Sequence, residues 1–366
     1  MTGRLEQLGG MSYRVDVERL AVRHRGGGTA PPALDDVSFS VEPGRVCGLF
    51  GREGAGKSTL LACLAAYRRP SGGTVRVDGE DPYENARLMS GICLVDGRGG
   101  IGVDESTTVR EVLEIVALLR PRWDQAFANR LLDRFEVAVG AKVGTLARGR
   151  RAALAVTIGL ASRAPLTMVD EAHLDLEPDY LSAFHQELRA DQAAHPRTII
   201  LAGATVGDGD GDGDDGGGMD GRGGMDSHSM DSHGGDSPGG DGGREDSGGT
   251  GNGGGGLLDD VVLLGRGRVL AAGRPAELRA LGRELTGEAG TVADFLRAVV
   301  GDATAVVADR RLGRLRSVVL TGPMPPEGLT TAERAGISVG PVGLRALVTY
   351  LTNDRPQSGD QRERMS

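Results

Sequence analysis

Apolar residues along the first 200 positions follow strand-like and helix-like patterns in turn. Two stretches between Tyr13 and Val41 alternate apolar with polar residues, as paired strands do, and a glycine-rich loop separates them. Short runs then predict further strands, two of which, Gly91–Val95 and Leu166–Val169, are expected to be buried. These runs are Arg45–Phe50, Thr74–Gly79, Gly91–Val95, Leu166–Val169 and Arg197–Leu201.

Helices are predicted between these strands, where apolar residues recur every three or four positions. The predicted helices are Leu60–Ala66, Thr108–Leu119, Asp124–Phe135, Arg151–Ser162 and Pro178–Ala194. Pro178 suits the first turn of its helix, where a missing N–H costs nothing. Strands that alternate with helices predict an α/β fold.

The pattern stops between Gly207 and Gly256. This stretch holds 23 glycines and eleven Asp but almost no apolar side chains, so burial cannot offset the entropy of ordering it, and we expect disorder. Its Gly-Asp repeats lack the nonapeptide period of a calcium-binding β-roll, which favours a flexible insertion over a Ca²⁺ site. His228 and His233 lie within it, where solvated side chains are favoured over weak transition-metal binding.

Strand-like runs Val261–Leu264 and Arg268–Ala271 resume the fold after the insertion. A helix at Thr291–Val300, a strand at Ser317–Leu320 and a turn into a closing helix at Val339–Val348 follow. They predict a small α+β extension over residues 281–352. The polar residues 353–366 are expected to form a disordered tail.

Composition excludes several classes of protein. No apolar run reaches the ~18 residues that span a bilayer, and Met1–Gly10 lacks the apolar core of a secretory signal, so a membrane role would require a partner. Cys47, Cys63 and Cys93 lie in apolar runs without a CxxC pattern, which predicts buried thiols in a reducing cytosol.

The net charge of the chain comes from one tract. The whole chain carries −9, whereas residues 207–256 alone carry −10, from eleven Asp and one Glu against Arg222 and Arg244. The remainder is therefore close to neutral. It shows no basic patch interleaved with aromatic residues, so we expect no nucleic-acid partner.

One motif carries the chemistry. Residues 51–59 read Gly-Arg-Glu-Gly-Ala-Gly-Lys-Ser-Thr, the G-x-x-x-x-G-K-[S/T] pattern of a nucleotide-binding phosphate loop, set between a predicted strand and a predicted helix. That setting favours a phosphate loop over a chance glycine turn, and it predicts that the chain binds ATP or GTP. The predicted phosphate-binding residues are Gly51, Arg52, Glu53, Gly54, Ala55, Gly56, Lys57, Ser58 and Thr59. Lys57 is expected at the β- and γ-phosphates and Ser58 at Mg²⁺.

A second motif follows about 110 residues later. The predicted strand Leu166–Val169 runs directly into Asp170 and Glu171. A carboxylate at the end of such a strand holds the Mg²⁺ shell, so Ser58 and Asp170 are the predicted metal ligands. Glu171 is predicted to be the catalytic residue that polarises an attacking water. The alternative is that the acidic pair only caps the next turn.

In this order of motifs the chain resembles the ATP-binding subunits of ABC transporters, with the closest similarity to exporter-type subunits that carry a short C-terminal extension. The resemblance covers about Tyr13–Ala280. It implies a P-loop NTPase (RecA-like) core with an antiparallel β-subdomain and an α-helical subdomain, an ABC ATP-binding domain over residues 13–280, and ATP with Mg²⁺ as cofactors.

The resemblance places further residues at the nucleotide. His24 stands where the family stacks an aromatic ring on adenine. Leu146–Arg150 corresponds to the family signature that closes on the γ-phosphate of the opposite subunit; Ala147 lacks the signature hydroxyl, whereas Gly149 and the helix dipole remain. Arg148, which replaces a glycine, and Arg150 or Arg151 supply positive charge there, unless the segment is simply a basic helix start.

Three other family positions also differ. Residues 96–100 contain no glutamine where the family has one, and Asp96 is the nearest candidate ligand. Leu174–Glu177 ends in Glu rather than the family's Asp. Ala204 occupies the place of the switch histidine, so we expect hydrolysis to be slow or to depend on a partner chain.

The resemblance implies an ATPase subunit that couples ATP binding and hydrolysis to a separate multi-span membrane permease, which Thr108–Phe135 would contact. It implies a homo- or heterodimer of ATP-binding subunits that is cytoplasmic and peripheral on the inner face of the cell membrane, without inserting into it. The alternative is a degenerate ATP-binding regulatory subunit paired with a competent one. A soluble ATPase of translation or repair is disfavoured, because the duplicated cassette or coiled-coil arm usual in that group is not seen.

Overall fold

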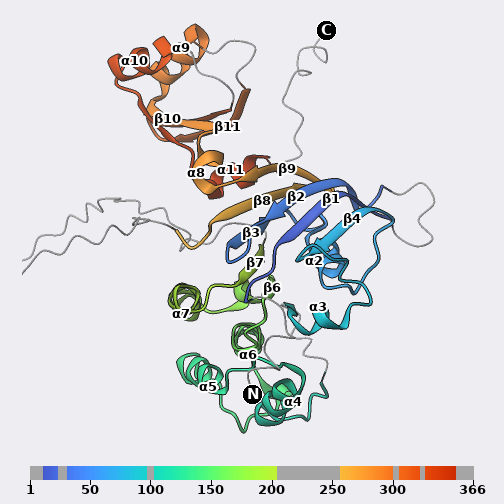
Figure 1. Ribbon diagram of the computed structural model, residues 1–366. Coiled ribbons are helices and arrows are strands. Elements are labelled where there is room, and N and C mark those ends of the chain that lie inside the picture. Colours follow the sequence, from blue (N-terminus) through green and yellow to red (C-terminus); the bar gives the residue numbers. More distant parts are fainter. Residues whose placement is uncertain are drawn as a thin grey trace, which may run out of the picture.

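The computed structural model describes residues 11–23, 31–96, 103–203, 256–299, 305–321 and 326–351 (Figure 1). His24, residues 97–102, Ala204, the glycine- and aspartate-rich stretch up to residue 255, and the tail from residue 352 lie outside these ranges. The predictions made for them therefore stay predictions.

A six-stranded sheet forms the centre of the described part, in the order β5-β6-β7-β3-β8-β9. The strands from β5 to β8 run parallel, and β9 closes the edge antiparallel to β8. The bounds are β3 Val46–Phe50, β5 Ile92–Asp96, β6 Leu166–Asp170, β7 Thr198–Gly203, β8 Asp260–Gly265 and β9 Arg268–Gly273. Every residue of β3 and β7 is buried, as expected for central parallel strands covered on both faces.

The two faces of this sheet carry separate cores. Ile200 and Ala202 of β7 join one core with helix α2 (Lys57–Leu64) and a small antiparallel sheet. Ile199 and Leu201 of the same strand join the other core with the helical segment. This alternation is the two-residue period of a strand whose neighbours lie on both sides.

The small sheet has the order β2-β1-β4 and packs beside α2. Its strands are β1 Val15–Val22, β2 Leu34–Val41 and β4 Gly72–Val77, and both pairings are antiparallel. The expected antiparallel β-subdomain is therefore present. Ala33 and Leu34, where β2 begins, lie directly against the phosphate loop.

Helices from the middle of the chain cover the other face and extend below it in Figure 1. They are α4 Val109–Leu119, α5 Gln125–Arg134, α6 Arg148–Ala161 and α7 Pro178–Ala194, with single 3₁₀ turns η1 Val143–Thr145 and η2 Ala172–Asp175. The short helix α3 Ala86–Ser90 instead joins the core of the small sheet through Leu88. Helix α4 begins with a capping box between Thr108 and Glu111, and Asp124 caps α5 through the backbone N–H of Phe127. Each predicted helix lies within a few residues of its observed position.

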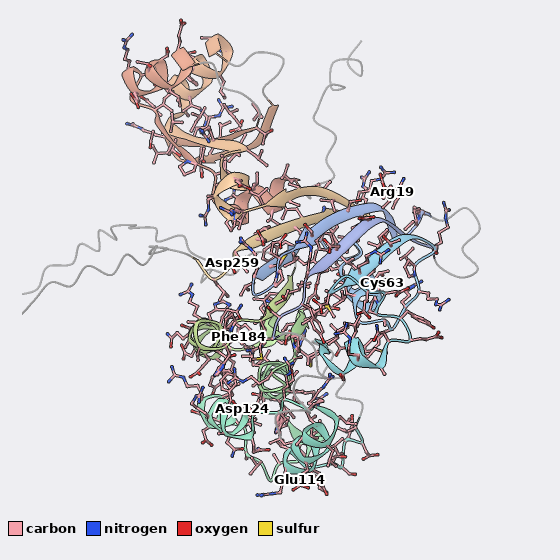
Figure 2. All side chains as sticks on the ribbon, viewed as in Figure 1. Arg19, Cys63, Glu114, Asp124, Phe184 and Asp259 are labelled. Atoms are coloured by element: carbon pink, nitrogen blue, oxygen red, sulfur yellow. The ribbon has the colours of Figure 1, made fainter. Side chains whose placement is uncertain are left out.

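A buried ion network ties these helices to the sheet. Asp191 of α7 pairs with Arg163, after α6, and with Arg197 before β7, where Arg197 Nη1 lies 2.6 Å from Asp191 Oδ2. Arg163 also reaches Asp124, labelled in Figure 2, at 2.9 Å. Asp191 and Arg197 are each 2 % exposed. Because losing one member would leave a buried charge unpaired, the network fixes the helical segment in one position.

The C-terminal elements form a second sheet, drawn in orange and red at the top of Figure 1. The strands β10 Gly282–Glu288, β11 Ala305–Leu312, β12 Leu315–Thr321 and β13 Ser338–Pro341 pair antiparallel in the order β11-β12-β10-β13. With α9 Ala289–Val299 and α10 Pro326–Arg334 they make a β-α-β-β-α-β unit. The sequence predicted mixed elements here, but not β10, β11, α10 or β13.

Two helices join this unit to the first domain. Helix α8 (Pro275–Arg279) follows β9, and α11 (Leu344–Leu351) packs against α8 and the second sheet. Leu344, Leu347 and Val348 belong to the same core as the sheet's helical face. Helices α9 and α10 instead cover the opposite face of the second sheet through a small core of their own. The proposed domain boundary near residue 280 thus falls in a packed junction.

Two composition-based predictions concern the described residues. Cys47, Cys63 and Cys93 are buried free thiols, as predicted. Burial raises the pKa of the Cys63 thiol to about 11, which makes it a poor nucleophile. None of the helices in the described ranges combines the length and the apolar character that a bilayer crossing requires.

Candidate nucleotide-binding site

The phosphate loop links the end of β3 to the start of α2. Gly54 and Gly56 both adopt left-handed conformations, with φ of 79° and 104°. A Cβ at Gly56 would lie 2.7 Å from the Ala33 carbonyl oxygen, and one at Gly51 would lie 2.4 Å from that of Leu264. Gly51 and Gly56 therefore allow close backbone approach, and the positive φ favours glycine at position 56.

Lys57 is the first residue of α2, and its side chain is only 4 % exposed. Its Nζ donates hydrogen bonds to the carbonyl oxygens of Gly51 at 2.7 Å and Arg52 at 3.2 Å. It also lies 3.1 Å from Glu171 Oε1. The ammonium group is thus held inside the loop, at the positive end of the helix.

Asp170 ends β6 and faces the start of α2. Burial raises the pKa of its carboxyl group, and a hydrogen bond with the Ser58 side chain partly opposes that shift. Its Oδ1 is buried and has no hydrogen-bond partner. An orphaned carboxylate oxygen beside a hydroxyl suits a hard cation such as Mg²⁺, which prefers oxygen ligands and keeps several of its waters.

Glu171 follows with a strained backbone. Its φ is 62°, in the left-handed region that a residue with a side chain seldom adopts. Its N–H donates to the Ala202 carbonyl oxygen at 3.0 Å, which fixes the turn between β6 and η2. About half of the side chain is exposed. Strain of this kind costs roughly 1–3 kcal/mol and clusters at functional sites.

These residues border one cleft of about 550 Å³. The lining residues are Ser58, Asp96, Arg148, Arg151, Asp170, Glu171, Leu174 and Asp175. Asp96 and Asp170 are register partners at the ends of β5 and β6. The cleft therefore has a strand wall, made by the ends of parallel strands and the start of α2, and a helix wall, made by the first turn of α6 and by η2.

The structure brings only some of the predicted site residues into this cleft. Ser58, Asp170 and Glu171 line it, and Lys57 reaches it through Glu171. Arg52, Glu53, Gly54 and Ala55 instead border a second cavity of about 600 Å³, together with the turn between β8 and β9 and Leu351 of α11. Their assignments to the nucleotide stay predictions, as do those of Gly51, Gly56 and Thr59.

In the signature-like segment, arginine side chains line the cleft, whereas the two residues predicted to contact the nucleotide do not. Ala147 is the N-cap of α6 and makes no side-chain cap. Neither Ala147 nor Gly149 lines the cleft, whereas Arg148 and Arg151 do. Arg150 is engaged elsewhere: it pairs with Glu136 at 2.9 Å and lies over the ring of Tyr180.

Sequence reasoning missed the part played by Asp175. Its Oδ1 lies 2.7 Å from Arg148 Nη2, and its side chain is 15 % exposed. No local pattern signals this contact, because the two residues belong to separate segments that meet only through packing of α6 against η2. The described residues contain no group of three His, Cys, Asp or Glu side chains arranged for a metal ion.

Known proteins resemble this chain in sequence and in fold. A family model described as ABC transporter matches residues 34–173. A probable anion import ATP-binding protein of Haloferax volcanii is 31% identical over 213 residues, which cover 51% of this chain and 71% of that protein. The chain belongs to the ABC transporter ATP-binding proteins. Its matched residues include both the phosphate loop and the Asp170–Glu171 pair.

Other members of the ABC transporter family differ in size. The mycobactin import ATP-binding/permease protein IrtB of Mycobacterium tuberculosis is 30% identical over 204 residues. The match covers 52% of this chain but only 34% of IrtB, so the chain spans about a third of that relative. A solved ATP-binding subunit of an ABC transporter, 19% identical, has a TM-score of 0.52 over 73% of this chain and 92% of its own. That likeness confirms the α/β fold of an ABC ATPase.

Proposed function

We propose that the chain is an ATPase subunit that binds Mg·ATP in the cleft and couples ATP binding and hydrolysis to a separate multi-span membrane permease. The observation that carries this proposal is the meeting of Lys57, Ser58, Asp170 and Glu171 at one place, although the two motifs are about 110 residues apart. We propose that it acts as a homo- or heterodimer of ATP-binding subunits at the inner, cytoplasmic face of the membrane.

The proposed roles follow from the contacts of each side chain. The backbone N–H groups of the loop and the start of α2 bind the phosphate oxygens. Lys57, whose ammonium group already lies inside the loop, places a positive charge beside the phosphate oxygens. Ser58 and Asp170 hold the metal; when bound, Mg²⁺ neutralises phosphate charge. Glu171, whose side chain reaches the cleft, accepts a proton from the attacking water.

Measurement of phosphate release with Mg·ATP tests these roles. We expect Glu171→Gln to lower turnover by roughly 10²–10³-fold while ATP binding persists. Glu177→Gln is the matched control, because this nearby carboxylate does not line the cleft. Unchanged turnover in Glu171→Gln would show that Glu171 is not the base.

A groove beside the cleft supports the permease contact. It has a volume of about 220 Å³ and lies between the end of β5, the helices α4 and α6, and Tyr67. Tyr67 and Leu119 border it and are 67% and 69% exposed. An exposed apolar groove is suited to the apolar face of a partner helix. We propose that a cytoplasmic segment of the permease docks here.

Two neighbouring leucines of α4 give a matched test of this contact. Leu119 borders the groove, whereas Leu118, 88% exposed, does not. We expect Leu119→Asp to move the protein from the membrane fraction of its host cells to the supernatant, and Leu118→Asp to leave it in place. If both variants stay with the membranes, the groove is not the contact.

A second function is favoured by the helix wall. Ala147 supplies no hydroxyl at the start of α6, and Arg148 stands where the family has a glycine. These differences support a regulatory subunit that binds ATP with little hydrolysis and works beside a competent partner. ATP binding without measurable phosphate release by the wild-type chain, and with no effect of Glu171→Gln, would favour this function.

A further inference from the structure

The small sheet borders a cavity that lies apart from the nucleotide cleft. This β4 cavity, of about 290 Å³, is bordered by the last turn of α2, the residues that follow that helix, strand β4 and the turn at residues 81–83. Cys63 of α2, labelled in Figure 2, lines it. The β4 cavity shares no lining residue with the cleft of Asp170 and Glu171. Its volume, at the lower end of the range for ligand pockets, suits a small molecule.

Three guanidinium groups line the β4 cavity. Arg68 and Arg69 follow α2, and Arg76 comes from β4. Among the residues that the structure describes, the nearest carboxylate oxygen to any of the three belongs to Glu84, 3.8 Å from Arg69 Nη2. An ion pair at that distance, between two mostly exposed side chains, contributes little. Most of the positive charge of the cavity is therefore left for a ligand to neutralise.

The three arginines also keep most of their hydrogen-bond donors. Arg68 Nη2 donates one long bond of 3.4 Å to the Arg23 carbonyl oxygen, and Arg76 Nη1 donates one of 3.2 Å to a backbone carbonyl. The guanidinium carbon of Arg69 lies 4.0 Å from the centre of the Tyr83 ring. That cation–π contact uses the face of the guanidinium rather than its N–H groups. Since each guanidinium has five donors, an anion in the cavity finds several of them.

The backbone after α2 fixes the start of the arginine pair and weakens the negative end of the helix. Ala66 has a left-handed φ of 59°. The N–H groups of Tyr67 and Arg68 both donate to the Ala62 carbonyl oxygen, at 2.8 and 3.1 Å, and the N–H of Ala66 donates to that of Cys63 at 3.1 Å. Because the partial charge of a helix end resides on its unpaired carbonyls, these bonds reduce the repulsion of an anion.

Charge and shape favour a phosphate group as the ligand. Of the described residues that line the cavity, only Asp81 is acidic, and its Oδ1 accepts a bond from the Tyr83 N–H at 2.9 Å. Three guanidiniums against one carboxylate suit a phosphate monoester, whose charge is about −1.5 to −2 at neutral pH. The planar fork of arginine also matches phosphate oxygens. Val75 and Pro82, both buried, offer an apolar surface to a short carbon chain.

We propose that the β4 cavity binds a small phosphate monoester, with Arg68, Arg69 and Arg76 at its phosphate group. The site lies beyond the last turn of α2, whereas Lys57 and the phosphate loop stand at the first. Binding here requires neither the phosphate loop nor Mg²⁺, so it is separate from the proposed function.

Calorimetric titration of the full chain with glycerol 3-phosphate tests this site, with glycerol as the uncharged control. We expect Arg76→Ala and Arg68→Ala each to weaken binding by roughly tenfold, the loss of one charge-assisted contact. Arg76→Lys, which keeps the charge without the planar fork, should fall between. Arg19→Ala is the matched control, because Arg19, labelled in Figure 2, is exposed on the neighbouring strand β1 and does not line the cavity.

The phosphate loop also attracts phosphate groups, and Lys57→Ala separates the two sites. Binding that survives Lys57→Ala and weakens in Arg76→Ala supports the β4 cavity. Binding that is lost in Lys57→Ala and kept in Arg76→Ala would place the ester in the loop and overturn the assignment. Equal losses in Arg76→Ala and Arg19→Ala, or no binding by the wild-type chain, would overturn it as well. Failure of Mg·ATP to bind would contradict the proposed function alone, because none of the three arginines lines the nucleotide cleft.

Inorganic phosphate in the same titration distinguishes a free anion from an ester. We expect it to bind more weakly than glycerol 3-phosphate, because it leaves Val75 and Pro82 without a contact. Equal affinity would overturn the choice of an ester. Far-UV circular dichroism checks that Arg76→Ala folds; should it not fold, Arg68→Ala gives the same comparison from the other side of the cavity.

Discussion

The strand wall and the helix wall of the cleft are held in different ways. On the strand wall, backbone groups hold the key residues: the carbonyls of the loop accept hydrogen bonds from Lys57 Nζ, and the backbone N–H of Glu171 donates to the Ala202 carbonyl oxygen. On the helix wall, Arg148 depends on one carboxylate and is mostly exposed. The strand wall is therefore organised before a nucleotide arrives, whereas the helix wall has contacts that can be exchanged.

The two walls should therefore contribute differently to nucleotide binding. A loop whose lysine is buried and held by backbone carbonyls gains affinity, because little ordering remains to be done on binding. An exposed side chain with one exchangeable partner is held less firmly. Damage to the strand wall should therefore weaken nucleotide binding more than damage to the helix wall.

The largest expected effect comes from removing the charge on the strand wall. Lys57→Ala takes away the buried ammonium and leaves the Gly51 and Arg52 carbonyls without their donor. We expect affinity for Mg·ADP and Mg·ATP alike to fall by at least about 100-fold, measured by calorimetry. Lys142→Ala, at an exposed position, is the control. Unchanged nucleotide binding by Lys57→Ala would remove the basis of the proposed site.

Two glycines of the phosphate loop test how rigid the strand wall is. Gly54 and Gly56 both have positive φ, but a Cβ at Gly54 meets nothing within 4 Å, whereas one at Gly56 lies 2.6 Å from Leu34 Cδ2 and 2.7 Å from the Ala33 oxygen. We expect Gly54→Ala to lower the free energy of unfolding by about 1 kcal/mol through backbone strain. Gly56→Ala should lower it by about 2–4 kcal/mol, since overpacking adds to the strain.

Urea unfolding of the two variants measures this difference. Because the Ala33 oxygen belongs to the backbone just before β2, it cannot move aside as a side chain would. Gly56→Ala should also weaken nucleotide binding, as the loop shifts against β2. Equal stability losses in the two variants would mean that the small sheet yields, and that the strand wall is less rigid than its contacts indicate.

The sequence predicted the strands and the helix that form the strand wall well, because the information for them is local. The phosphate loop and the Asp170–Glu171 pair are short runs, and buried strands that precede them are marked by apolar composition. Parallel strands then bring the two motifs together at one edge of the sheet. The same locality explains why the strands and helices of the first domain lie close to their predicted positions.

The helix wall and the second sheet depend on contacts between distant residues, which a pattern of apolar positions does not encode. Arg148 meets Asp175 only because α6 packs against η2, and the buried pair Asp191–Arg197 looks like two surface charges in the sequence. Strand β10, with the sequence Gly-Arg-Glu-Leu-Thr-Gly-Glu, has one large apolar residue and owes its place to pairing with β12 and β13.

A pH dependence of stability is expected to originate behind the helix wall. His173 of η2 and His185 of α7 are buried and flank Phe184. Burial lowers the pKa of His173 to about 3 and that of His185 to about 4. Both imidazoles are neutral in the folded chain at neutral pH, and unfolding below the ordinary value of 6.5 lets them take up protons.

The stability that these histidines contribute is complete above about pH 6.5 and is lost as the pH falls toward their folded-state pKa values. Between pH 6.5 and pH 4.5 we expect the free energy of unfolding to fall by up to about 1.4 kcal/mol per pH unit for each histidine. Asp170 titrates in the opposite sense, since burial raises the pKa of its carboxyl group. Urea unfolding across this range measures the slope, and His173→Phe and His185→Phe should each remove about half of it. A slope that survives in the double variant would place its origin elsewhere. A slope that disappears would assign it to the two buried imidazoles of η2 and α7.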